Sequence, residues 1–272
     1  MKAGREGIAW RVILYNDQSS SSLRIMEIAE FLRSLLPSLE VEVREDPFIH
    51  YRGRYDPESL ARKLASIRIV DAVTGRLNCD PLMPEVEYEL RRVLDPNLRC
   101  HGVLYDGYEL MALIADLIPF EERKRGTLHV VFTGRLVGTK ELGEDRVHAR
   151  VVILGNPAIV STTGAVEAPA RPREYYLALM LSRNPLVQQV TVSAVRASGG
   201  WDWLEYGDTR LTEVMKGYIL QTLFYHFLGE AFCEDPDCRL YNAHYQPELI
   251  RSQLLSGKLC ERHEGMLRTL LR

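Results

Sequence analysis

The first part of the chain alternates between two hydrophobic patterns. Residues 8–15 (IAWRVILY) are rich in β-forming side chains, and residues 40–45 (EVEVRE) alternate between apolar and charged positions, so both predict strands. Residues 23–36 place apolar side chains on one broad helical face and stop before a proline. Asp56 followed by Pro57 is typical of a helix start. The chain is therefore expected to begin β-α-β-α.

The same criteria predict the later elements. Helices are expected after Pro84 and within residues 101–119 and 172–181, and strand-rich runs at residues 127–139 and 146–164. A Gly-containing segment joins these two runs, which suggests a hairpin or neighbouring strands. The last long helix is expected to run from an N-cap at Asp208 or Thr209 to about Leu228, with Gly229 ending it.

These elements predict one mixed α/β (α+β) domain over residues 1–272. No linker rich in Pro, Gly or Ser is long enough to separate two domains. Within this domain, residues 209–272 are expected to form the C-terminal helix and a cysteine-bearing segment.

Composition and charge point to no particular class of partner. The net charge of −3 arises from 34 basic and 37 acidic residues spread along the chain, so there is no nucleic-acid signal. No run of 18 apolar residues suggests a membrane span, and the start MKAGREGIAW lacks the apolar core of a signal peptide. We therefore expect a cytoplasmic protein in a reducing compartment.

The cysteines predict a metal site in the last fifth of the chain. Cys233-x4-Cys238 and Cys260-x2-His263 are two short pairs separated by 21 residues, the spacing of a closed tetrahedral zinc site. Three thiolates and an imidazole leave no open position, so the sequence predicts one structural zinc ion. His244 is the alternative fourth ligand.

The two other cysteines, Cys79 and Cys100, lie far from this set in the sequence. A free cysteine commonly behaves as a small apolar side chain. Both are therefore expected to be buried.

The stretch QTLFYHFLGEAFCEDPDC, residues 221–238, resembles the archaemetzincins, which are metzincin-type zinc peptidases. Their signature is H-E-x-x-H-x-x-G-x-x-H-C-x4-C-x-M, followed downstream by C-x2-C. The matching positions here are His226, Gly229, Cys233 and Cys238, with Cys260 and His263 on the last pair. The resemblance implies a metzincin-like fold, in which a mixed twisted sheet packs against helices and a structural zinc site closes a helical C-terminal subdomain.

The sequence departs from this signature at the catalytic positions. Thr222 and Phe232 replace the first and third zinc histidines, Leu223 replaces the catalytic glutamate, and Leu240 replaces the methionine. A single imidazole, that of His226, cannot hold zinc in the open site that activates water. The resemblance therefore implies a metallopeptidase-like chain whose peptidase site is degenerate.

Three functions follow from this combination. The leading hypothesis is a pseudoenzyme that uses the former substrate cleft to bind a peptide or protein. The first alternative is an active zinc-dependent hydrolase with a metal site rebuilt around His226, using Glu230, His244 or residues of the strand region, although the aromatic neighbours of His226 favour a core or cleft-lining position. The second alternative is a zinc module that docks on a large assembly.

One other segment gathers polar groups around a predicted helix start. Residues 161–176 (STTGAVEAPARPREYY) contain Glu167, Arg171, Arg173 and Glu174. An anion or a peptide carboxylate could bind there. A turn, a proline-initiated helix and solvated charges explain the same pattern, and this interpretation is favoured.

Overall fold

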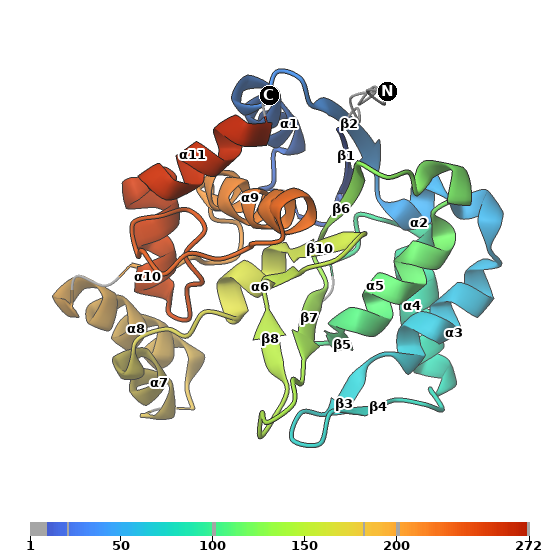
Figure 1. Cartoon of the computed structure of the whole chain (residues 1–272). Coiled ribbons are helices and arrows are strands. Elements are labelled where there is room, and N and C mark those ends of the chain that lie inside the picture. The colour runs from blue at the N-terminus through green and yellow to red at the C-terminus, as the bar shows by residue number, and fades with distance from the viewer. Residues whose placement is uncertain (1–9, 21, 100–101, 182, 200–201, 271–272) are drawn as a thin grey trace, which may run out of the picture.

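The structure is a computed structural model that describes residues 10–20, 22–99, 102–181, 183–199 and 202–270. Its centre is a five-stranded sheet with the order β2-β1-β6-β10-β9 (Figure 1), in which β9 is antiparallel and the other strands are parallel. The strands are β1 (Arg11–Asn16), β2 (Glu40–Glu45), β6 (Thr127–Thr133), β9 (Val152–Ile153) and β10 (Ala158–Ser161). The strand predictions for the N-terminal half are confirmed.

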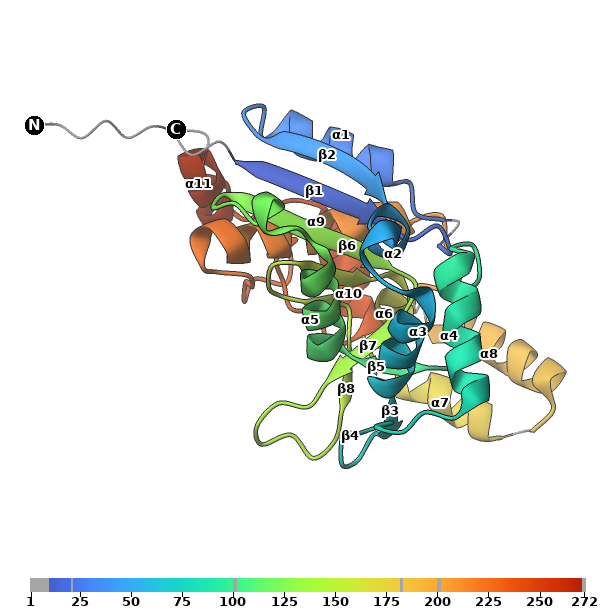
Figure 2. The same ribbon diagram turned by 90° about the vertical axis from the view of Figure 1, so that its right-hand side faces the viewer.

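Helices cover both faces of this sheet, so its central strands are mostly apolar and largely buried. Val12 and Leu14 of β1 face one core, Ile13 and Tyr15 face the other, and every residue of β6 is buried. The views in Figures 1 and 2 show α1 (Ile25–Leu35) and α9 (Leu211–Leu228) on the first face. The second face carries α2 (Pro47–His50), α3 (Pro57–Ser66), α4 (Met83–Leu94) and α5 (Gly107–Leu117). Short 3-10 helices follow α2 and α5, η1 (Arg52–Arg54) and η2 (Phe120–Glu122).

Two smaller sheets extend from the central one. The strands β5 (Leu104–Asp106), β7 (Leu136–Thr139) and β8 (His148–Arg150) form one, and β3 (Ile69–Asp71) and β4 (Arg76–Leu77) form the other. Because β7 and β8 pair antiparallel, the predicted hairpin is confirmed. The short segment from β8 to β9 thus links an edge of the three-stranded sheet to an edge of the five-stranded sheet.

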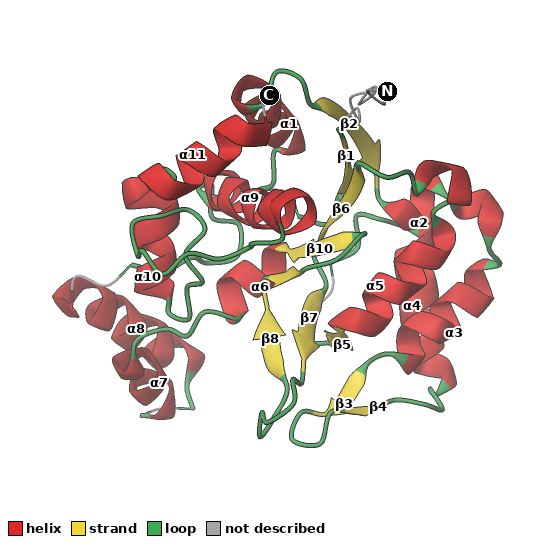
Figure 3. Cartoon of the chain, viewed as in Figure 1, coloured by secondary structure: helices red, strands yellow, loops and turns green. Residues whose placement is uncertain are grey.

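The C-terminal part is helical (Figure 3), as predicted. It contains α6 (Thr162–Glu167), α7 (Arg173–Met180), α8 (Pro185–Gly199), α9, α10 (Gln246–Ile250), the π-helical turn η3 (Arg251–Ser256) and α11 (Glu261–Leu270). The predicted N-cap of α9 is wrong: the cap is Arg210, because its carbonyl accepts the N–H of Val214 four residues on, whereas the Asp208 carbonyl accepts the N–H of Leu211 in a preceding turn. The expected mixed α/β class is confirmed. Among the described residues, no helix combines the length and apolar character needed to cross a membrane.

Candidate metal centre and groove

The helix α9 brings the chain to the cysteine segment. It ends at Gly229, whose φ of 76° is the left-handed conformation that glycine adopts at little cost. This position confirms the predicted helix end. The chain then turns back, and the main-chain N–H of Glu230 donates to the carbonyl of Phe224. The next residues therefore start directly beside the last turn of α9.

Short main-chain hydrogen bonds fold the cysteine segment. The N–H of Cys233 donates to the Leu240 carbonyl at 2.9 Å, and the N–H of Cys238 donates to the Asp235 carbonyl at 3.0 Å. A β-bridge between Cys238 and Lys258 brings the second ligand pair alongside the first. The spacing of the pairs in the sequence thus becomes proximity in space.

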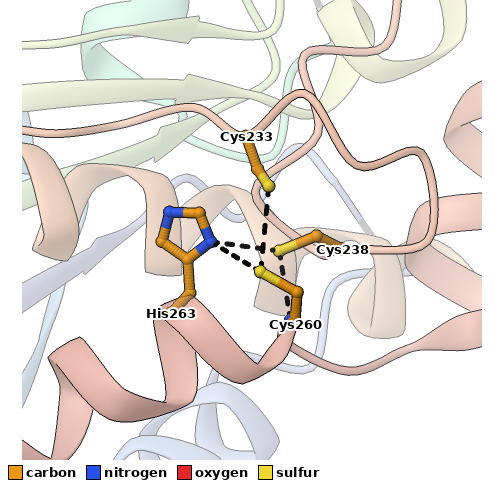
Figure 4. A group of neighbouring side chains, drawn as sticks. All are labelled: Cys233, Cys238, Cys260 and His263. Carbon is orange, nitrogen blue, oxygen red and sulfur yellow. Dashed lines mark hydrogen bonds between the residues drawn. The ribbon is translucent and has the colours of Figure 1, made fainter.

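Three sulfurs and one ring nitrogen converge on a common point (Figure 4), and these atoms all lie within 4.8 Å of one another. The Sγ atoms of Cys233 and Cys260 are 3.9 Å apart, and Nδ1 of His263 is 3.6 Å from Sγ of Cys238 and 3.0 Å from Sγ of Cys260. Tetrahedral zinc bonds of ordinary length would place two sulfurs about 3.8 Å apart and a sulfur and a nitrogen about 3.5 Å apart. The donor set therefore fits a zinc ion.

The surroundings of the sulfurs suit a bound cation. Main-chain N–H groups of Asp235 and Cys260 donate to the sulfurs of Cys233 and Cys238, at 3.4 and 3.5 Å. Burial raises the pKa of the Cys238 thiol to about 12 and also raises the pKa of Cys233. Without a cation these side chains are thiols, and metal binding would release their protons.

A carboxylate stands behind the histidine. The His263 ring is completely buried, and its second nitrogen, Nε2, lies 3.4 Å from Oε1 of Glu230, close but not aligned as a hydrogen bond. Arg262 forms an ion pair with the same carboxylate. A carboxylate on the far nitrogen commonly orients a metal-bound imidazole. Glu230 is thus placed to position His263.

The structure separates the other predicted site residues. His244 is exposed and lies away from the three sulfurs, so the histidine brought to the cluster is His263. His226 is half-buried with its ring against Phe227, and burial lowers its pKa. Within the described part of the chain, the Cys3His group is the single set of His, Cys, Asp and Glu close enough to share an ion. The set of His226, Glu230 and His244 is not assembled.

The prediction for Cys79 is wrong, because this residue is exposed. It lies just after β4, in a segment that does not contribute to the described core. Cys100 lies outside the described residues.

A groove of about 690 Å³ lies beside α9. Tyr218 and Tyr225 of α9 line it together with Phe232. The edge strands β8 and β9 line it as well, as do residues 168–170 and 242–245. His244 therefore faces this groove instead of the metal cluster.

A comparison with known protein families shows how this chain is related to them. The family described as "Probable metallopeptidase family (DUF6775)" matches residues 9–270. The chain belongs to this family. The metallopeptidase part of the resemblance drawn from the C-terminal motif is therefore confirmed. No curated protein matches the chain. Among solved structures, the chain is similar to archaemetzincin from Methanopyrus kandleri, with 14% identity, 98% coverage of both chains and a TM-score of 0.43.

Three of the four residues that the resemblance places at catalytic positions of the signature lie in the core. Thr222 and Leu223 are completely buried, and the Thr222 hydroxyl donates to the Ile219 carbonyl at 2.8 Å. Leu240 is also completely buried. Phe232 is 40% exposed and faces the groove. These side chains supply packing and no metal donors.

Sequence reasoning missed most of the groove residues. Tyr108, His148 and Arg150 line the groove but come from α5 and β8, far from the C-terminal motif. Residues 146–153 contain charged and apolar side chains in a strand pattern, which predicts a strand but not that it lies at an edge. Edge position depends on pairing between distant segments.

Proposed function

We propose that this metallopeptidase-family chain holds one structural zinc ion at Cys233, Cys238, Cys260 and His263 and binds an extended peptide in the groove without cleaving it. The proposal rests on a contrast between the residues of α9 and those of the cysteine segment that follows it. Four metal donors converge after Phe232, whereas the catalytic positions Thr222 and Leu223 lie in the core. A site that activates water needs an open coordination position, and a Cys3His set leaves none.

The groove supports the peptide part of the proposal. Strands β8 and β9 lie at sheet edges, and edge strands carry main-chain N–H and C=O groups that can pair with an added strand. Tyr225 is 44% exposed and Phe232 is 40% exposed, and both line the same groove, so aromatic surface faces the same space. An extended segment could pair with an edge strand and bury side chains against these rings.

Elemental analysis of the purified chain tests the metal centre. About one zinc per chain is expected, and Cys238→Ser or Cys260→Ser should lose it, with a lower melting temperature. Cys79→Ser is the matched control, because Cys79 is an exposed cysteine outside the cluster. Two zinc ions per chain would overturn the assignment of a single structural site.

A paired assay of cleavage and binding tests the groove. Random short peptides should be retained by the zinc-loaded chain but not cleaved. Tyr225→Ala should weaken retention about tenfold, as loss of a central aromatic contact does. Tyr176→Ala, which alters a comparably exposed tyrosine on α7, should not. Chelator-sensitive cleavage abolished by His226→Ala would instead establish the active hydrolase.

A further inference from the structure

A second cavity lies away from the metal centre and the groove. It has a volume of about 350 Å³ and lies between the α7–α8 hairpin and residues 203–206. We call it the Arg171 cavity and define it by Arg171, Tyr175, Leu179, Val192, Trp203 and Glu205. Cavities of a few hundred Å³ with mixed apolar and polar walls are typical of small-molecule sites.

Flat apolar surfaces form much of its wall. The rings of Tyr175 and Trp203 meet edge to face with centroids 5.6 Å apart, and Trp203 is 1% exposed. Leu179 and Val192 add aliphatic surface. Such walls favour a ligand with a flat apolar body.

The two arginines near these rings differ in their partners. Arg196 lies over Trp203 and binds Asp202 at 2.6 Å, the Trp203 carbonyl at 2.9 Å and Glu205 at 3.1 Å. Arg171 lies over Tyr175, 4.8 Å from the ring centroid, and its side chain is only 11% exposed.

Despite this burial, Nε of Arg171 forms no hydrogen bond with any described residue. The ion pair of its guanidinium, to Glu167, spans 3.9 Å, which is longer than a hydrogen bond. Buried polar groups ordinarily have partners. Among the residues that the structure describes, Nε of Arg171 therefore lacks an acceptor.

We propose that the Arg171 cavity binds the carboxylate of a ligand with a flat apolar body. A carboxylate supplies two acceptor atoms in one plane, which match the edge of a guanidinium. A phosphate is disfavoured because its second negative charge would lie near Glu167 and Glu205, both of which line the cavity. The proposal requires neither the zinc centre nor the peptide groove.

Saturation-transfer NMR with phenylacetate and the zinc-loaded full chain tests this proposal. Binding in the millimolar range is expected, as is usual for a ligand of this size. Phenylacetamide, the neutral analogue, should bind at least about tenfold more weakly, because it lacks the charge. Arg171→Gln and Arg171→Lys should each lose phenylacetate binding to a similar extent. Arg173→Gln, which alters an exposed neighbour outside the cavity, should not.

The melting temperature of each variant shows whether it is folded. If Arg171→Gln does not fold, Arg171→Lys still provides the test, because lysine keeps the positive charge. A second arm compares a short peptide ending in a free phenylalanine carboxylate with its amidated form. Arg171-dependent binding of either carboxylate supports the proposal, and the tighter ligand identifies a free acid or a peptide terminus as the source. Equal binding of acid and amide, absence of binding by both carboxylates, or retention by folded Arg171 variants would overturn it.

Discussion

Replacing Glu230 with glutamine should weaken zinc binding without removing any metal donor. The carboxylate of Glu230 lies 3.4 Å from Nε2 of His263, whereas the other ring nitrogen, Nδ1, faces the sulfurs (Figure 4). Glutamine has nearly the same size but no charge, so the change tests the electrostatic contact alone. In the parent chain the carboxylate orients the imidazole and makes its Nδ1 a better donor.

The size of the effect follows from the geometry of this contact. Loss of such a carboxylate typically reduces metal affinity 10- to 100-fold. The Glu230 side chain is 30% exposed, its contact with Nε2 is not aligned as a hydrogen bond, and Arg262 shares its charge. Each of these features weakens the contact. We therefore expect the lower end of the range, about tenfold, or about 1.4 kcal/mol.

Competition with a chromophoric zinc chelator at fixed pH measures this affinity. Glu234→Gln is the matched control, because Glu234 is an exposed glutamate next to Cys233, and it removes the same charge near the centre without touching His263. The control should bind zinc like the parent chain. Equal affinity in Glu230→Gln and the parent would refute the reasoning, and equal losses in both variants would assign the effect to net charge.

Two predictions concern stability, each measured by chemical denaturation. Burial raises the pKa of Asp46 to about 7, so the folded chain retains a proton that the unfolded chain releases above pH about 4. Stability should therefore fall by up to about 4 kcal/mol as pH rises from about 4 to about 8. Asp46→Asn should abolish that fall, whereas Asp56→Asn at an exposed helix cap should not. A Cβ at Gly217 would lie 1.7 Å from Oε1 of the buried Gln253 amide, so Gly217→Ala should destabilise the chain by about 1–2 kcal/mol, despite better helix propensity. Gly265→Ala, in open space on α11, should stabilise it by up to about 1 kcal/mol, and the same sign for both glycine variants would contradict this account.

The sequence predicts a feature best when the residues that determine it lie within a few positions of one another. Asp56 caps α3 as expected, because its carboxylate accepts the N–H of Ser59. Asp208 has the same cap chemistry, but its carbonyl closes a turn with the N–H of Leu211 and the helix starts later. The spacing of Cys233, Cys238 and the later pair brought the four donors together because short turns hold each pair.

Local sequence patterns do not predict features that depend on contacts between segments far apart in the chain. The choice between His263 and His244 depends on the bridge from Cys238 to Lys258, which carries α11 to the cluster. The contact between Glu230 and His263 has the same origin, since Glu230 lies just after α9 and His263 lies on α11. The groove requires edges of two sheets to meet α9, and no short window of sequence contains this information.

The metal centre and the groove are parts of one structural unit, and this affects how chelation experiments are interpreted. Residues 242–245 line the groove and lie between the ligands Cys238 and Cys260, and Phe232 immediately precedes the first ligand. Without a metal ion, the four converging donors lose the bond that holds this segment against α9, so local opening becomes easier. Removal of zinc should therefore weaken peptide binding even though no zinc ligand lines the groove. Loss of binding on chelation is thus expected of a structural ion, and only chelator-sensitive cleavage would indicate a catalytic one.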